Sequence, residues 1–243
     1  AIHIAFFAAS SAALRAAIVL GRRDMLSMFS FAPLRPEAEF AFPAEMSFVV
    51  AASGVIAEKT GDARERYNRV SRMVRELTAS FGGETSLRGL IDEHGIDAVR
   101  AAAGGGISGF SAAEMVNRID QFYAENYEMI PAAAGHLAEG SFGRIGELID
   151  RSQKNAEQLL GNQVPETVFL QAAAREIGAV AASAFGAGFG GSVYALVPTR
   201  DADRFCREWR RHYLGRYPEH TAASDFFVTR PSRAEVPGSL LVG

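Results

Sequence analysis

The chain has 243 residues, of which 48% are hydrophobic and 22% charged, and its formal net charge is -3. This length and hydrophobic content suffice for one or two buried cores. Basic residues alternate with acidic ones and form no stripe of one sign, so we expect no nucleic-acid partner. The only cysteine, Cys206, has no partner for an internal disulfide, which favours a reducing compartment such as the cytoplasm.

The first twenty residues are strongly apolar and precede Arg22 and Arg23. A signal peptide carries its basic residues before the apolar run, and Arg15 interrupts this run before it reaches the length of a membrane span. We therefore expect neither a secretion signal nor a membrane partner. The histidines lie far apart and pair with no cysteine cluster, so they indicate no metal site.

Short apolar runs in the first quarter of the chain predict strands at residues 25–31, 37–42 and 47–53. Pro33 and Pro36 separate the first two runs, since proline ends regular structure.

Amphipathic spacing then predicts a series of helices. Ser111 followed by Glu114 is a capping-box pattern that opens one of them. The others are expected at 62–80, 142–160, 165–178 and 201–213, with two short helices within 86–100. Two further strands are expected at 192–197 and 224–229. This order of elements predicts an α+β fold in which helices cover one face of a mostly antiparallel sheet.

The sharpest local signal is the sequence GAGFGG at residues 186–191. Its glycines permit positive φ and close approach of the backbone, and successive amides can form an anion-binding nest. A tight turn that needs glycine only for packing is the alternative. The segment follows a helix and opens a strand, which is the reverse of a dinucleotide fingerprint. A P-loop ending at Lys59 and Thr60 is excluded, because Ser53 and Glu58 occupy its glycine positions.

Several segments resemble those of galactokinases within the GHMP family of small-molecule kinases. Residues 183–193 resemble the third motif of that family, and 138–152 resemble its segment that reads FGELM-x-x-S. Further similar segments are 48–55, 67–71 and 164–166. The segments occur in the family's order and span most of residues 25–230. The chain is therefore similar to the C-terminal two-thirds of a galactokinase-like protein.

The resemblance implies transfer of the γ-phosphoryl group of ATP to a monosaccharide hydroxyl, with galactose as the default acceptor and Mg²⁺ as cofactor. Tyr67 matches a family position near the sugar, although a place in the helix core is equally open. The residues that the resemblance assigns to nucleotide and phosphate binding are Ser10, Ser11, Gly186, Gly188, Gly190 and Gly191. Ser11 is also the implied magnesium ligand, and an ordinary helix start is the alternative for the two serines.

The chain also departs from the family. The first family motif has no counterpart, and the catalytic aspartate is expected in a segment missing between Gly21 and Arg22, so the catalytic base is unknown. Asp24 is not expected to be the base, because it directly precedes a strand and lies beside Arg22 and Arg23 in a charged loop. A chain without these parts is not expected to be competent. The alternatives are a GHMP kinase for another small alcohol, and a catalytically inactive sugar or nucleotide sensor.

The resemblance implies a division into three parts. Residues 1–55 are expected to be the remnant of the N-terminal kinase domain, 56–230 a ferredoxin-like C-terminal domain, and 231–243 a tail. We expect a cytoplasmic monomer or weak homodimer that binds ATP and a small sugar.

Overall fold

The computed structural model describes residues 20–31, 34–56, 62–82, 86–107, 109–186 and 188–232 of the chain, with only the backbone for Phe31, Leu34, residues 62–67 and Val70. Within this part of the chain, a four-stranded antiparallel sheet has the spatial order β4-β5-β3-β6. Its strands are β4 (Ala181–Phe185), β5 (Ser192–Pro198), β3 (Met46–Ala52) and β6 (Asp225–Thr229). The predicted α+β class with an antiparallel sheet is confirmed.

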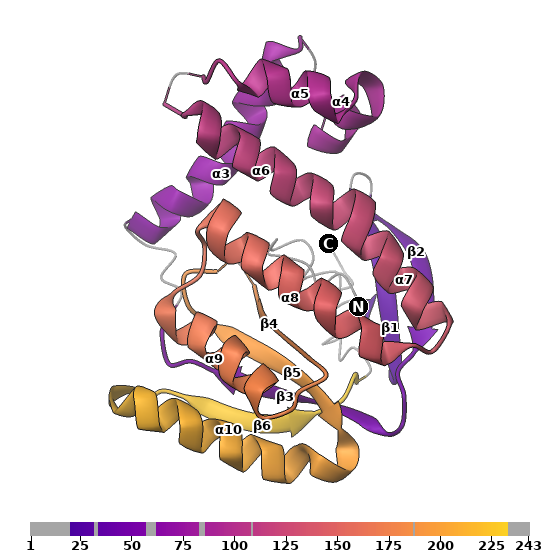
Figure 1. The fold of residues 1–243 in the computed structure, drawn as a ribbon, viewed down its shortest axis with the longest axis vertical. Helices are drawn as coiled ribbons and strands as arrows, with labels where there is room; N and C mark the ends of the chain where they lie inside the picture. The colour runs from indigo at the N-terminus through magenta and orange to yellow at the C-terminus, as the bar shows by residue number, and fades with distance from the viewer. Residues whose placement is uncertain are drawn as a thin grey trace, which may run out of the picture.

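Two helices, α9 (Pro165–Glu176) and α10 (Ala202–Arg216), cover one face of this sheet (Figure 1). Because side chains alternate along a strand, Val49 and Ala51 of β3 are fully buried on that face. Trp209 lies in the same core and donates its indole N–H to the carbonyl of Leu170, 2.9 Å away. The helices and the sheet thus share one core, as the hydrophobic pattern predicts.

The opposite face of the sheet packs on α7 (Ile130–Ala138), α8 (Ile145–Asn155) and the start of the hairpin β1 (Met25–Phe31) and β2 (Leu34–Ala41). Members of this second core are Leu26, Phe42, Met129, Ile149, Tyr194 and Leu196. Both faces are therefore buried, which fits the almost continuous apolar run of β5.

A third core joins the helices at the other end of the molecule (Figure 1). These are α3 (Asp62–Ser80), α4 (Leu87–His94), α5 (Ile96–Ala103) and α6 (Ala112–Tyr123). The capping box predicted at Ser111 is confirmed, since Ser111 Oγ accepts from the Glu114 amide and Glu114 accepts from the Ser111 amide. This cap fixes where α6 starts.

Two helices change to π geometry along their length. The helix α6 continues through the π segment η1 (Ala124–Met129) into α7, and α8 continues through the π segment η3 (Ala156–Leu160). The sequence analysis expected uninterrupted helices here. A π turn admits one extra residue and is frequent at functional sites.

The strand pattern differs from prediction at two places. The strand β2 begins at Leu34 and contains Pro36, opposite a register shift between Met28 and Phe29 of β1. Proline is tolerated there because β2 belongs to a two-stranded sheet. The sequence analysis missed β4 altogether, because its alanine-rich sequence has low strand propensity.

The expected domain boundary at residue 55 stays a prediction. The strand β3, which precedes it, is an interior strand that pairs with β5 from Met46↔Pro198 to Ala52↔Ser192 and with β6 on its other side.

Candidate active site around the glycine loop

The glycine loop, residues 186–191, connects β4 to β5. Gly188 has φ +82 and Gly190 φ +123, which confirms that they take conformations closed to most residues. Phe189 between them has φ +59, an outlier for a bulky residue. The loop is therefore held in an unusual backbone shape by its surroundings.

Close backbone contacts explain why glycine is needed at two of these positions. A Cβ at Gly188 would overlap the carbonyl oxygen of Asn162, and a Cβ at Gly190 would lie 2.7 Å from the carbonyl oxygen of Val55. The amide of Phe189 donates to the Asn162 carbonyl at 2.6 Å, and the amide of Gly191 donates to the Val55 carbonyl at 2.9 Å. The loop is thus fixed between the segment that follows η3 and the segment that follows β3.

The other two glycines have free space beside them within the described part of the chain. A Cβ added at Gly186, with φ +101, or at Gly191, with φ +87, would meet no described atom within 4 Å apart from those of its chain neighbours. These positions leave room for a group that approaches the backbone closely, which is what a phosphate requires of a glycine-rich loop. Close packing therefore explains the glycines at 188 and 190, whereas room for a bound phosphate would explain those at 186 and 191.

Side chains from two helices cover the outer edge of β4, where the loop begins. Gln153 on α8 accepts from the amide of Ala184 at 2.9 Å and from Ser183 Oγ at 3.0 Å. Gln171 on α9 donates to the carbonyl of Ala182 at 3.2 Å, and Arg175 donates to the carbonyl of Val180. These bonds satisfy an edge that would otherwise be open and hold the start of the glycine loop. Sequence reasoning did not identify these residues.

A pocket of about 210 Å³ lies beside the loop. Its lining comes from α3, α6, the end of η3 and the loop itself: Arg69, Met73, Glu114, Asn117, Arg118, Leu159, Leu160, Gly161 and Phe189. In its wall, Arg69 donates to Glu114 Oε1 from Nε at 3.2 Å and from Nη2 at 2.7 Å. The bonds from Arg69, with those from Ser111, lower the pKa of Glu114 to about 2. The sequence analysis read Glu114 only as a capping residue.

The structure tests the other predicted site residues only in part. Ser10 and Ser11 lie outside the described residues. Tyr67 lies on α3, two positions before Arg69, in the stretch where only the backbone is described. Its assignment to the sugar site therefore stays a prediction.

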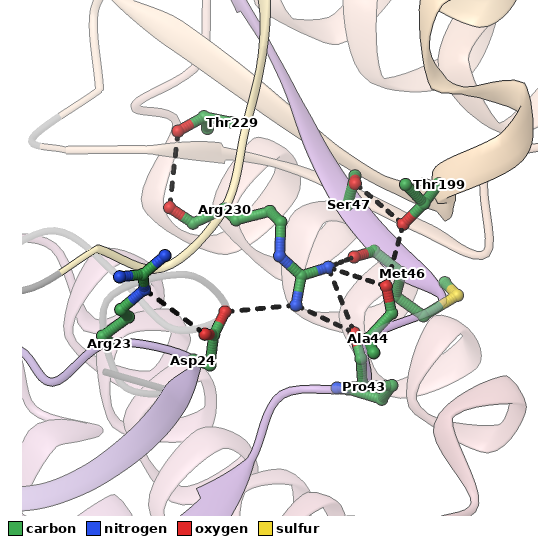
Figure 2. Close-up of polar contacts among 9 residues, drawn as sticks. All are labelled: Arg23, Asp24, Pro43, Ala44, Met46, Ser47, Thr199, Thr229 and Arg230. Carbon is green, nitrogen blue, oxygen red and sulfur yellow. Dashed lines mark hydrogen bonds and ion pairs between the residues drawn. The ribbon is translucent and has the colours of Figure 1, made fainter.

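Asp24 takes part in a cluster of ion pairs and hydrogen bonds (Figure 2). Its carboxylate pairs with Arg230 Nη2 at 3.1 Å and with Arg23 Nε at 3.6 Å, and its backbone has φ +53. Arg230 also donates to the carbonyls of Pro43, Ala44 and Met46. The cluster thus fastens the start of β1 and the end of β2 to the chain that follows β6. This role supports the prediction that Asp24 is not the catalytic base.

Among the residues that the structure describes, no group of three histidine, cysteine or carboxylate side chains is arranged to hold a metal ion. The same part of the chain contains no helix with the length and apolar character of a membrane span.

Comparisons with known proteins agree with this architecture. Residues 131–214 match the family described as GHMP kinases C terminal, a range that runs from α7 into α10 and contains the glycine loop. The structure of Lactococcus lactis galactokinase complexed with galactose is similar with a TM-score of 0.70 at 19% identity, over 87% of this chain and 52% of the galactokinase. L. major mevalonate kinase in complex with R-mevalonate has a TM-score of 0.48 at 16% identity, over 86% of this chain and 50% of that one. The chain thus spans about half the length of these structures.

Proposed function

We propose that this chain, which belongs to the GHMP kinases through the C-terminal domain matched at residues 131–214, takes part in ATP-dependent phosphorylation of a small-molecule hydroxyl. The observation that carries this proposal is the glycine loop. It lies inside the matched range, its backbone is strained, and Gly186 and Gly191 leave space for a phosphate group. Phosphoryl transfer depends mainly on positioning and on charge stabilisation, and backbone amides of a loop held by hydrogen bonds to Asn162 and Val55 can supply both.

The hydrogen bonds that the loop already makes limit which of its amides could bind a phosphate group. Because the amides of Phe189 and Gly191 already donate to protein carbonyls, bound phosphate would draw on other amides of the loop. In our proposal Ser10 and Ser11 complete the phosphate site, and Ser11 ligates Mg²⁺. The bound ATP and Mg²⁺ supply the transferred group and neutralise its charge.

We propose a monosaccharide as the acceptor and galactose as the first one to test. The support is the ordered resemblance of sequence segments to galactokinases, together with the similarity of fold to the galactokinase complexed with galactose. Tyr67 is the proposed sugar contact, since a phenol can donate to a hydroxyl while its ring packs on the sugar.

The test is an ATP-consumption assay on the full-length protein with Mg²⁺, against a panel of monosaccharides and of small alcohols that are not sugars. We expect sugar-dependent ATP consumption with the highest kcat/KM for galactose, and loss of turnover when EDTA removes the metal. Turnover with only a non-sugar alcohol would refute the monosaccharide as the acceptor but would leave the proposed phosphoryl transfer intact. Absence of ATP consumption with every acceptor, combined with sugar binding in calorimetry, would refute the kinase proposal and favour a binding protein on the same fold.

A further inference from the structure

Arg118 on α6 lines the pocket beside the glycine loop and is only partly paired. Its Nη1 donates to Gln121 Oε1 at 2.5 Å, and its guanidinium carbon lies 5.5 Å from the centre of the Phe122 ring. Its Nε is buried and has no hydrogen-bond partner among the described residues. Because protein covers Nε, only the terminal nitrogens of Arg118 can meet a ligand in the pocket, and a charged donor left without an acceptor is unfavourable.

The nearby carboxylate does not satisfy Arg118. Glu125 interacts with it electrostatically, but the two form no ion pair in the described part of the chain. Glu125 is buried, accepts instead from Ser152 Oγ at 2.8 Å, and burial raises its pKa. It lies in the π segment η1, and the end of the second π segment, η3, lines the same pocket.

The remaining walls contribute no net charge that could neutralise Arg118. Arg69 and Glu114 neutralise each other. The other walls are mainly apolar, from Met73, Leu159, Leu160 and Phe189, with Asn117 as an additional polar group. The pocket therefore offers one cationic end and a mostly apolar body.

Within the described part of the chain, Nη2 of Arg118 forms no hydrogen bond, and a terminal nitrogen of a guanidinium binds carboxylate or phosphate oxygens through strong charge-assisted bonds. We propose that this pocket is a binding site for a small organic anion whose acidic group is held by Arg118 and whose carbon atoms contact the apolar walls. Because Phe189 lines the pocket and belongs to the glycine loop, the ligand contacts that loop directly. Apart from Phe189, the residues that line this pocket have no role in the proposed kinase reaction.

The acidic group of the ligand can be a phosphate or a carboxylate, and the choice of probe distinguishes the two. Glycerol 3-phosphate presents a phosphate ester, butyrate presents a carboxylate, and glycerol serves as the uncharged control. Binding is measured by calorimetry on the full chain and by the NMR shift of the Phe189 amide. We expect saturable binding of one of the two acids, with a shift at Phe189, and no binding of glycerol.

Matched variants locate the binding. Arg118→Gln should weaken it at least tenfold, and Arg118→Lys, which keeps the charge but loses the fork, should weaken it several-fold. Arg200→Gln removes the same charge from a highly exposed side chain on another element and should leave binding unchanged. Leu160→Phe fills the pocket without altering a charge and should also abolish binding, which keeps the test valid if Arg118→Gln does not fold.

The phosphate arm must also be separated from the proposed nucleotide site. Gly190→Val should impair nucleotide binding more than it impairs binding of the probe, whereas Arg118→Gln should impair binding of the probe and leave nucleotide binding intact. The proposal is overturned if neither acid binds the wild-type chain at about 10 mM, a very weak affinity. It is equally overturned if binding survives both Arg118→Gln and Leu160→Phe.

Discussion

Replacing Gly190 by alanine tests how the glycine loop is held. With φ +123 at this position, an added Cβ would lie 2.7 Å from the carbonyl oxygen of Val55 and 3.0 Å from its Cγ1. Relaxed atoms do not approach so closely, so the loop or the segment after β3 must move. The movement breaks the 2.9 Å hydrogen bond from the Gly191 amide to the Val55 carbonyl.

The magnitude follows from these two effects. A residue other than glycine at such a φ costs about 1–3 kcal/mol. The lost hydrogen bond adds about 0.5–1.5 kcal/mol. We therefore expect Gly190→Ala to lower the free energy of unfolding by roughly 2–4 kcal/mol, a large part of the 5–15 kcal/mol typical of a domain. The branched Gly190→Val should in addition abolish kinase turnover of the full-length protein.

Gly191→Ala is the matched control. Its φ is +87, but the added Cβ would meet no atom of the described residues within 4 Å beyond its chain neighbours, so the variant has backbone strain without the contact to Val55. Urea unfolding can be followed by the fluorescence of Trp209, the only tryptophan, which is fully buried in the core of the sheet. Equal losses of stability for the two variants would refute the close approach to Val55. Near-normal turnover of Gly190→Val would show that the loop is only a turn.

Three further predictions concern single side chains. Tyr67→Phe should raise the KM for the sugar several-fold, as expected for the loss of one hydrogen bond of about 0.5–1.5 kcal/mol, and leave the KM for ATP unchanged. Steady-state kinetics measure both constants, and an unaltered KM for the sugar would show that Tyr67 only packs in the helix core. Asp24→Asn should keep kcat within a few-fold while lowering the thermal midpoint, because it removes the ion pair with Arg230; loss of turnover in a folded variant would contradict this. The pKa of Glu114 is lowered to about 2, so its pairing with Arg69 stabilises the fold above the ordinary carboxyl pKa and is lost as the pH falls towards 2. Acid titration of stability should therefore be shallower over that range in Glu114→Gln, and an unchanged slope would refute the pairing.

Local sequence signals predicted the elements whose cause is local. The capping box at Ser111 and the strand that begins at Met25 depend on neighbours within a few residues, so the sequence contains the whole signal. The strand β4 was missed because its partners, β5 and the edge side chain Gln153, are decided by the tertiary fold. Alanine has little strand preference of its own, so pairing and burial override it.

The sequence alone also indicated that the glycines of residues 186–191 permit positive φ, because glycine lacks a Cβ. Only the tertiary structure divided these glycines into two kinds. Gly188 is required by the carbonyl of Asn162 and Gly190 by that of Val55, whereas Gly186 and Gly191 have free space beside them in the described part of the chain. The same holds for Arg118, since its position on an amphipathic helix does not reveal that its Nε has no acceptor among the described residues. Whether a backbone or a guanidinium meets protein or empty space depends on segments distant in the chain, and close packing of those segments decides it.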